Sequence, residues 1–362
     1  MASNRDKSFS KKLKARRHVY DRDEVAALFR KISEERVDVL ASKLVGYIST
    51  NLPAAFEKRN GIAAYRTNPY VLVTAASVMK LRDPAHFAKF LFDSKLYMAL
   101  ETSFGKQIEA AFVGQYPLRA DHRWNDPPEK LAEFAALEGL DNETKAQRRL
   151  ESVWREIDRS CVVDGRRFLT SIKSGPNTIN DTQVAGMTTA ILSNYKAWLA
   201  QTRATYPNIE EIDIVLGLTY GTDKTTNNKE NQILVKLLDQ GFEEEDSAHK
   251  PGILIDTETR KVRVYRCIGR DFWSFIGQPN AQHESDFVFL EVLLALASAL
   301  GSGIAEADIE TRINAKLQQL ASSLGLLSFP RNSLPEWVRE DFTEDQLFWF
   351  ATAMTAFFDE GI

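Results

Sequence analysis

A two-residue turn between two β-rich segments is the strongest constraint on how this sequence can fold. Asp164-Gly165 lies between the β-rich residues 154–163 and 166–173. Asp-Gly between two such segments is a strong signal for a β-hairpin. Farther along, residues 212–218 predict an inner strand and residues 252–268 predict a second hairpin. The centre of the chain therefore predicts a β-sheet.

Helical patterns surround these strands. Apolar residues recur at helical spacing over residues 23–48. Asn180 or Asp181 is expected to cap a long helix that runs toward Thr205. Further helices are predicted at residues 69–81, 84–92, 95–115 and 129–137, from the end of a polar loop to Leu238, and again over 286–358. This order of elements predicts an α/β (α+β) protein, in which a mixed sheet is flanked by helices with helical additions at both ends.

The formal net charge of -4 hides an uneven distribution of charge. Residues 1–20 contain seven basic side chains and one acid, a net charge of +6, whereas residues 284–362 contain four basic side chains and thirteen acids, a net charge of -9. The stretch between them is nearly neutral. The overall charge therefore excludes only a uniformly basic surface, and a polyanion remains a possible partner if the acids face away from it.

The cysteines and the apolar segments indicate the cellular compartment in which the protein is expected. Cys161 and Cys267 lie in segments with alternating apolar residues, so we expect two small buried side chains and neither a disulfide framework nor a zinc site. The basic N-terminus is not followed by an apolar stretch, as a secretory signal would be, and residues 287–300 are too few to span a bilayer. The sequence predicts a soluble, cytoplasmic protein that does not bind a membrane.

The first hairpin brings reactive side chains together. Alternation along the strands places Glu156 and Asp158 on one face of the first strand, and Ser171 and Lys173 on one face of the second. Antiparallel pairing brings Asp158 close to Ser171 and Lys173. A cross-strand salt bridge on a wet sheet face explains this pattern as well as a site does. A site of this kind fits metal-assisted phosphodiester hydrolysis, because aspartate binds hard cations such as Mg²⁺ and lysine supports the attacking hydroxide and the developing charge.

Four stretches of the chain resemble known nucleases. Asp158 followed by Ser171-Ile172-Lys173 resembles the D…(D/E)XK motif of the PD-(D/E)XK nucleases. Residues 172–180 resemble a stretch of type II restriction endonucleases that cut interrupted GG-N-CC-type sites. Residues 101–109 resemble the upstream helix of such enzymes, whose last glutamate points at the active site, and residues 269–277 resemble their late G-x-x-F-W-x-x-I-G segment. The resemblance covers about half of the chain.

The resemblance implies a PD-(D/E)XK fold and a type II restriction endonuclease. Such an enzyme uses Mg²⁺ to hydrolyse both strands of a specific palindromic or interrupted-palindromic site in double-stranded DNA. It acts as a homodimer, because a twofold protein matches a twofold site, and a cognate DNA methyltransferase is expected in the same system. The alternatives are a structure-specific nuclease of DNA repair or of a mobile element, and a non-catalytic DNA-binding relative.

The resemblance also implies roles for individual residues, with one departure from the family pattern. Ser171 stands where the family has an acid, so one metal ligand is missing from its usual place. Related enzymes with Ser or Thr there recruit a carboxylate from a helix. Glu109 is the first candidate for this ligand, and Asp181 and Glu156 are alternatives. The remaining roles implied are metal binding by Asp158 and by the main-chain carbonyl of Ile172, transition-state stabilisation by Lys173, and hydrogen bonding by Ser171.

Two basic or polar segments are candidates for contact with DNA. Arg148, Arg149 and Arg155 precede the first strand, where they are expected to contact backbone phosphates. The polar loop 222–229 contains Lys224, Asn227 and Asn228, which suit contacts with phosphates or base edges, although a merely solvated loop has the same composition.

We expect the chain to divide into four parts. These are a basic flexible arm at residues 1–20, an N-terminal helical region at 21–94, the nuclease core at 95–283 and a C-terminal helical region at 284–362.

Overall fold

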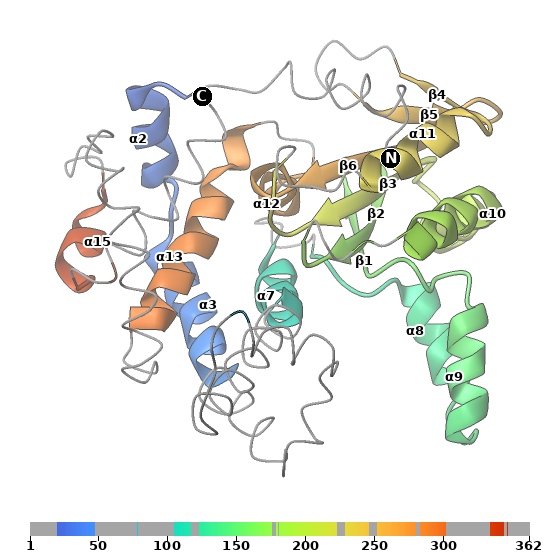
Figure 1. Ribbon diagram of the computed structural model, residues 1–362, viewed down its shortest axis with the longest axis horizontal. Coiled ribbons are helices and arrows are strands. Elements are labelled where there is room, and N and C mark those ends of the chain that lie inside the picture. The colour runs from blue at the N-terminus through green and yellow to red at the C-terminus, as the bar shows by residue number, and fades with distance from the viewer. Residues whose placement is uncertain are drawn as a thin grey trace.

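The computed structural model describes residues 20–47, 78, 105–116, 123–175, 179, 181–222, 229–245, 252–279, 283–301, 334–343 and 346 (Figure 1). Residues 1–19 of the expected arm and the predicted helix at 84–92 lie outside the described residues, and of the predicted helix at 69–81 only Val78 is described. Within the described part of the chain, no helix is long and apolar enough to cross a membrane.

A six-stranded mixed sheet with the strand order β1-β2-β3-β6-β5-β4 forms the centre of the protein. Strands β2, β3 and β6 run parallel to one another. β1 pairs antiparallel with β2 at one edge, and β5 and β4 continue antiparallel beyond β6 at the other. The strands are Arg159–Val163 (β1), Arg166–Lys173 (β2), Glu211–Leu218 (β3), Phe242–Glu244 (β4), Leu254–Asp256 (β5) and Val262–Ile268 (β6). The predicted α/β (α+β) class, the inner strand and the second hairpin are confirmed.

The first hairpin turns at the predicted dipeptide. Asp164 and Gly165 have φ angles of 50° and 76°, and Val163 pairs with Arg166 across the turn. A type I′ turn needs positive φ at both central residues, which Asp and Gly adopt more readily than most residues. Local turn chemistry therefore determines the register of β1 against β2.

The first strand is shorter than the sequence predicts. Residues 153–156 form a turn, and β1 begins only at Arg159. Trp154 is 1% exposed in this turn, and its indole Nε1 donates a hydrogen bond of 2.7 Å to Gln201. The chain leaves the sheet here because the indole packs against the neighbouring long helix, where it also contacts Trp198.

Each face of the sheet is covered by helices (Figure 1). On one face, α10 (Asp181–Thr205) and α11 (Lys229–Leu238) bury apolar side chains against Leu169 and Ile214. On the other face, Phe168 and Val215 belong to a core shared with α3 (Glu34–Gly46), α7 (Gly105–Phe112), α12 (Arg270–Gly277) and α13 (Phe287–Gly301). Cys161 and Cys267 are buried free thiols in this second core, as predicted.

The predicted helix at residues 23–48 is in fact two helices, α2 (Arg22–Arg30) and α3. Ser33 interrupts them, because its backbone is extended and its hydroxyl accepts a hydrogen bond from the Arg36 N–H as the N-cap of α3. The buried carboxylate of Glu291 in α13 accepts from the Ser33 N–H at 3.0 Å, from the Arg36 guanidinium at 2.6 Å and from the Tyr116 hydroxyl at 2.5 Å. This network joins the N-terminal helices to α13.

Two helices were not predicted as helices from the sequence. α9 (Asn142–Glu151) buries none of its residues, so it lacks the apolar periodicity that identifies most helices. α12 follows the last strand, and its Trp273 is 1% exposed and donates a hydrogen bond of 2.8 Å to the carbonyl of Thr219. The remaining described helical elements are η4 (Val113–Gln115), α8 (Pro128–Ala135), η5 (His283–Ser285) and α15 (Glu336–Asp341).

Candidate active site

Asp158 is held against the end of β2 by backbone hydrogen bonds. Its N–H donates to the carbonyl of Thr170 at 2.8 Å, and its carboxylate Oδ2 accepts from the Ile172 N–H at 2.6 Å. The N–H and C=O of one strand residue point to the same side of the strand, so the Ile172 carbonyl points toward Asp158 as well. The hairpin therefore places the Asp158 carboxylate and the Ile172 carbonyl next to each other, one residue before Lys173.

Glu109 reaches the same place from α7 on the other side of the hairpin. Helix α7 begins at Gly105, where a Cβ atom would lie 2.3 Å from the Cβ of Ser174, the residue after Lys173. Only glycine allows so close an approach of the helix to the end of β2. Glu109 lies one turn later on the same side of the helix, and its Oε1 is 3.7 Å from Nη2 of Arg159.

The pKa shifts show that the charges of Asp158 and Lys173 act on Glu109, and that the charge of Lys173 acts on Asp158. Burial raises the pKa of Glu109, and the nearby charge of Asp158 raises it further, whereas Arg159 and Lys173 lower it. Burial also raises the pKa of Asp158, against the opposing effects of Lys173 and of the Ile172 N–H. The structure thus brings together the three charged residues that the sequence named first.

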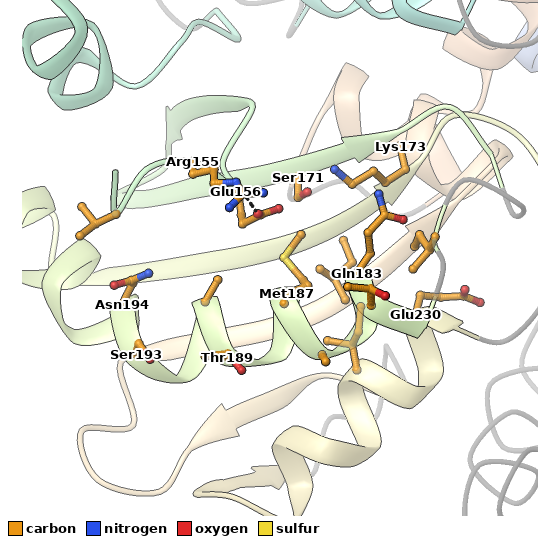
Figure 2. Close-up of a pocket in the computed structure, with 18 of the residues that line it drawn as sticks. Arg155, Glu156, Ser171, Lys173, Gln183, Met187, Thr189, Ser193, Asn194 and Glu230 are labelled. Atoms are coloured by element: carbon orange, nitrogen blue, oxygen red, sulfur yellow. Dashed lines mark ion pairs between the residues drawn. The ribbon is translucent and has the colours of Figure 1, made fainter. Parts of the chain in front are cut away.

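Ser171 and Lys173 face a groove between β2 and α10 with a volume of about 890 Å³ (Figure 2). Ser171 is 2% exposed, and its hydroxyl has no hydrogen-bond partner among the residues that the structure describes. In Figure 2 the side chain of Lys173 extends along the groove between Ser171 and Gln183 of α10. A buried hydroxyl without a partner is destabilising, so this one is available to a ligand or a water molecule.

The two alternative carboxylates lie in other surroundings. Glu156 lines the same groove, where its Oε1 is 3.3 Å from Nε of the neighbouring Arg155 (Figure 2). Asp181 begins α10, forms an ion pair with Lys229 and has a side chain that is 86% exposed. An exposed carboxylate with a lysine partner is a weaker candidate for a metal ligand than the partly buried Glu109.

Of the six residues predicted to contact DNA, the three that the structure describes lie at the surface near the groove. Arg148 and Arg149 are exposed in the last turn of α9; Arg148 is 3.9 Å from Glu151, and the Arg149 guanidinium lies 5.3 Å from the centre of the Phe134 ring. Arg155 is exposed at the rim of the groove. Lys224, Asn227 and Asn228 lie outside the described residues.

Three charged residues around Asp158 were missed by sequence reasoning. The Arg159 guanidinium forms an ion pair with Asp126 and donates to the carbonyl of Asp158 at 3.1 Å. Lys130 Nζ donates to the carbonyl of Ile157 at 2.6 Å, and its charge lowers the pKa of Asp158. The position of Arg159 directly after Asp158 could have identified it from the sequence. Asp126 and Lys130 come close to Asp158 only through the tertiary fold.

The donors at this place suit a hard divalent cation. Among the described residues, no group of three or more His, Cys, Asp or Glu side chains could hold a metal ion. Mg²⁺, however, is commonly bound by one or two carboxylates together with waters and substrate phosphates. Asp158, Glu109 and the Ile172 carbonyl would supply oxygen ligands of this kind, and burial is the main reason why the pKa values of both carboxyls are raised.

The comparisons with known proteins agree with this chemistry. Residues 142–292 match the family described as Type II restriction endonuclease EcoO109I. No curated protein sequence matches the chain. The matched segment contains Asp158, Ser171 and Lys173 together with the whole sheet, whereas Glu109 lies before it. The mixed sheet flanked by helices is consistent with a restriction-endonuclease-like fold, and the match supports a type II restriction endonuclease.

Proposed function

We propose that this protein is a type II restriction endonuclease that hydrolyses phosphodiester bonds in both strands of a specific double-stranded DNA site, palindromic or interrupted-palindromic, with Mg²⁺. The observation that carries the proposal is the convergence of Asp158, Glu109 and Lys173 at the end of the first hairpin. Asp158 and Lys173 lie in the segment that matches the restriction endonuclease family.

Each residue has a role that follows from its surroundings. Asp158, Glu109 and the Ile172 carbonyl would hold the cation, which when bound polarises the scissile phosphate and lowers the pKa of a bound water. The Ile172 N–H fixes the Asp158 carboxylate in place. The Lys173 ammonium stabilises the attacking hydroxide and the charge that develops on the phosphate. The Ser171 hydroxyl is buried without a hydrogen-bond partner among the described residues, and it would donate a hydrogen bond to a group bound in the site.

The groove along α10 would take the DNA strand beside the scissile phosphate. Lys173 and Ser171 line it, and Arg155 stands at its rim. Arg148, Arg149 and Arg155 are exposed cations that precede the first strand in the chain. They are suited to backbone phosphates, which position the DNA without reading its sequence. Lys224, Asn227 and Asn228 follow β3 in the chain and would add polar contacts to phosphates or base edges.

Cleavage of both strands at a palindromic site needs two active sites related by twofold symmetry. One chain supplies one such site, so the enzyme would act as a homodimer. A restriction enzyme also requires its host DNA to be protected, which implies a cognate DNA methyltransferase in the same system, where both proteins would act in the cytoplasm.

The test is a digest of unmethylated DNA of broad sequence content with Mg²⁺, followed by sequencing of the cut ends. Discrete fragments with a common end sequence are expected. Lys173→Ala, Asp158→Ala and Glu109→Gln should each abolish cutting and leave DNA binding intact. Glu156→Gln and Asp181→Asn are matched carboxylate controls that should cut at the wild-type rate. Cutting by the Lys173 or Asp158 variant at the parent rate would contradict the assignment.

One observation favours a second candidate, a non-catalytic DNA-binding relative. Ser171 replaces the acid that the motif usually has, and a site without that ligand binds metal less well. In that case Asp158 and Lys173 form only a structural pair. The same protein would then bind DNA with a strong salt dependence and hydrolyse none at any Mg²⁺ concentration. Nicking of branched DNA without fixed fragments would instead indicate a structure-specific nuclease.

A further inference from the structure

Arg159 lies against the carboxylate that we assign as the helix-borne metal ligand. It is the first residue of β1, and its side chain is 24% exposed. Nη2 is 3.7 Å from Oε1 of Glu109, whereas Nη1 forms an ion pair with Asp126 and donates to the carbonyl of Asp158 at 3.1 Å. One guanidinium therefore contacts groups on three segments that meet at the proposed site.

The charge of Arg159 acts on both proposed carboxylate ligands. Its guanidinium lies 3.7 Å from the Glu109 carboxylate and donates to the main-chain carbonyl of Asp158. A cation between Glu109 and Asp158 would act on the same oxygens. Glu109 carries a single carboxylate, so the guanidinium and a metal ion would compete for the same negative charge.

Asp126 gives the guanidinium a second place to bind. Its side chain is 42% exposed and pairs with Nη1, while the contact of Nη2 with Glu109 is longer. A guanidinium presents several donors in a fixed planar fork, so it can keep Asp126 and release Glu109 with a small rotation. The pair with Asp126 thus holds Arg159 near the site after a metal ion has taken Glu109.

We propose that Arg159 is a positioning residue that neutralises Glu109 in the metal-free enzyme and competes with the metal ion for that carboxylate. The proposal rests on the proposed function, because it takes Glu109 and Asp158 as the metal ligands. It assigns to the enzyme an internal cation that keeps the two carboxylates close together before metal and DNA bind, and that raises the metal concentration needed to complete the site.

The test measures metal binding to the DNA-free protein, with Mn²⁺ as the probe and the electron paramagnetic resonance signal of free Mn²⁺ as the readout. Arg159→Met removes the competitor, so its Mn²⁺ dissociation constant should fall roughly fivefold. Lys130→Met is the matched control: it removes a charge that acts on Asp158 without contacting Glu109, and we expect less than about a twofold change. In a Glu109→Gln background, Arg159→Met should have no further effect.

The outcomes separate this proposal from the proposed function. Equal effects of Arg159→Met and Lys130→Met, or an effect that persists with Glu109→Gln, would show a general charge effect and overturn the competition. Weaker binding by Arg159→Met would overturn it as well. If wild type and Glu109→Gln bind Mn²⁺ alike, the ligand assignment itself fails. Should Arg159→Met not fold, Arg159→Lys is the second variant. Its shorter side chain reaches Glu109 less well, so its Mn²⁺ dissociation constant should be lower than that of wild type, and a value equal to or above that of wild type would contradict the proposal.

Discussion

Asp158 and Glu109 are held together against their mutual repulsion. Burial raises the pKa of both carboxyls, and the charge of Asp158 raises that of Glu109 further. A carboxyl whose pKa is higher in the folded than in the unfolded protein destabilises the fold once it is ionised. The stability that it contributes in its protonated form is lost as the pH rises from the unfolded toward the folded pKa. The ionised carboxylates of Asp158 and Glu109 therefore suit the binding of a cation but lower the stability of the fold.

Replacing Glu109 should make the protein more stable while abolishing its activity. At pH 8 the Glu109→Gln variant lacks an ionised buried carboxylate, so its free energy of unfolding should exceed that of wild type by about 1 kcal/mol. At pH 4, where the wild-type carboxyl is largely protonated, the difference should shrink. Urea unfolding at the two pH values measures this. A variant that is less stable than wild type at pH 8 would show that the ion pair with Arg159 outweighs the burial of the charge.

At the scale of elements, the position of α7 depends on one glycine. Gly105 lies against Ser174 at the end of β2, and a Cβ atom there would come within 2.3 Å of the serine Cβ. The contact involves atoms next to the backbone of both elements, so the helix has to move if a side chain is added. Movement of α7 displaces Glu109 from Asp158 and Lys173.

Gly105→Ala should therefore reduce cutting by at least about tenfold and destabilise the protein by roughly 1–3 kcal/mol. Gly46→Ala is the matched control at the end of α3, because no atom of the described residues lies within 4 Å of the added Cβ. That variant should cut like wild type and be as stable or slightly more so, since alanine favours a helix over glycine. Wild-type cutting by Gly105→Ala would show that α7 tolerates the displacement or that Glu109 is not needed.

Features that depend on local contacts can be predicted from the sequence, whereas features that depend on long-range contacts cannot. The hairpin was predictable because Asp164-Gly165 determines its turn locally, and the pairing of Asp158 with β2 follows from that register. The break at Ser33 was missed, since the apolar spacing continues across the cap. The ion pair of Arg159 with Asp126 was also missed, because no sequence spacing relates two segments that meet only after β1 has paired.

For the whole molecule, the sheet and the terminal helical segments form a continuous apolar core on one face. Residues of α2, α3, α7, α12 and α13 belong to one cluster with Phe168 and Val215 of the sheet. The buried Glu291 network adds polar contacts among α3, α13 and Tyr116. Helix α13, which lies in the described part of the acidic C-terminal segment, thus packs on the side of the sheet opposite the groove that Lys173 lines. We expect the negative charge of this segment to lie away from the surface that we assign to DNA.

We expect the basic arm to make the main sequence-independent contribution to DNA binding outside the groove. Residues 1–17 carry seven basic side chains and one acid. Each phosphate that a protein neutralises releases counterions, so the affinity for DNA falls steeply with salt in proportion to the number of such contacts. Deleting residues 1–17 should reduce the slope of log affinity against log salt concentration by an amount that corresponds to several phosphate contacts. The loss of affinity should be greatest at low salt. Deleting the arm should leave the cleavage positions unchanged, because phosphate contacts carry no sequence information. An unchanged salt slope would place the phosphate contacts on the body of the protein, where Arg148, Arg149 and Arg155 are the exposed candidates.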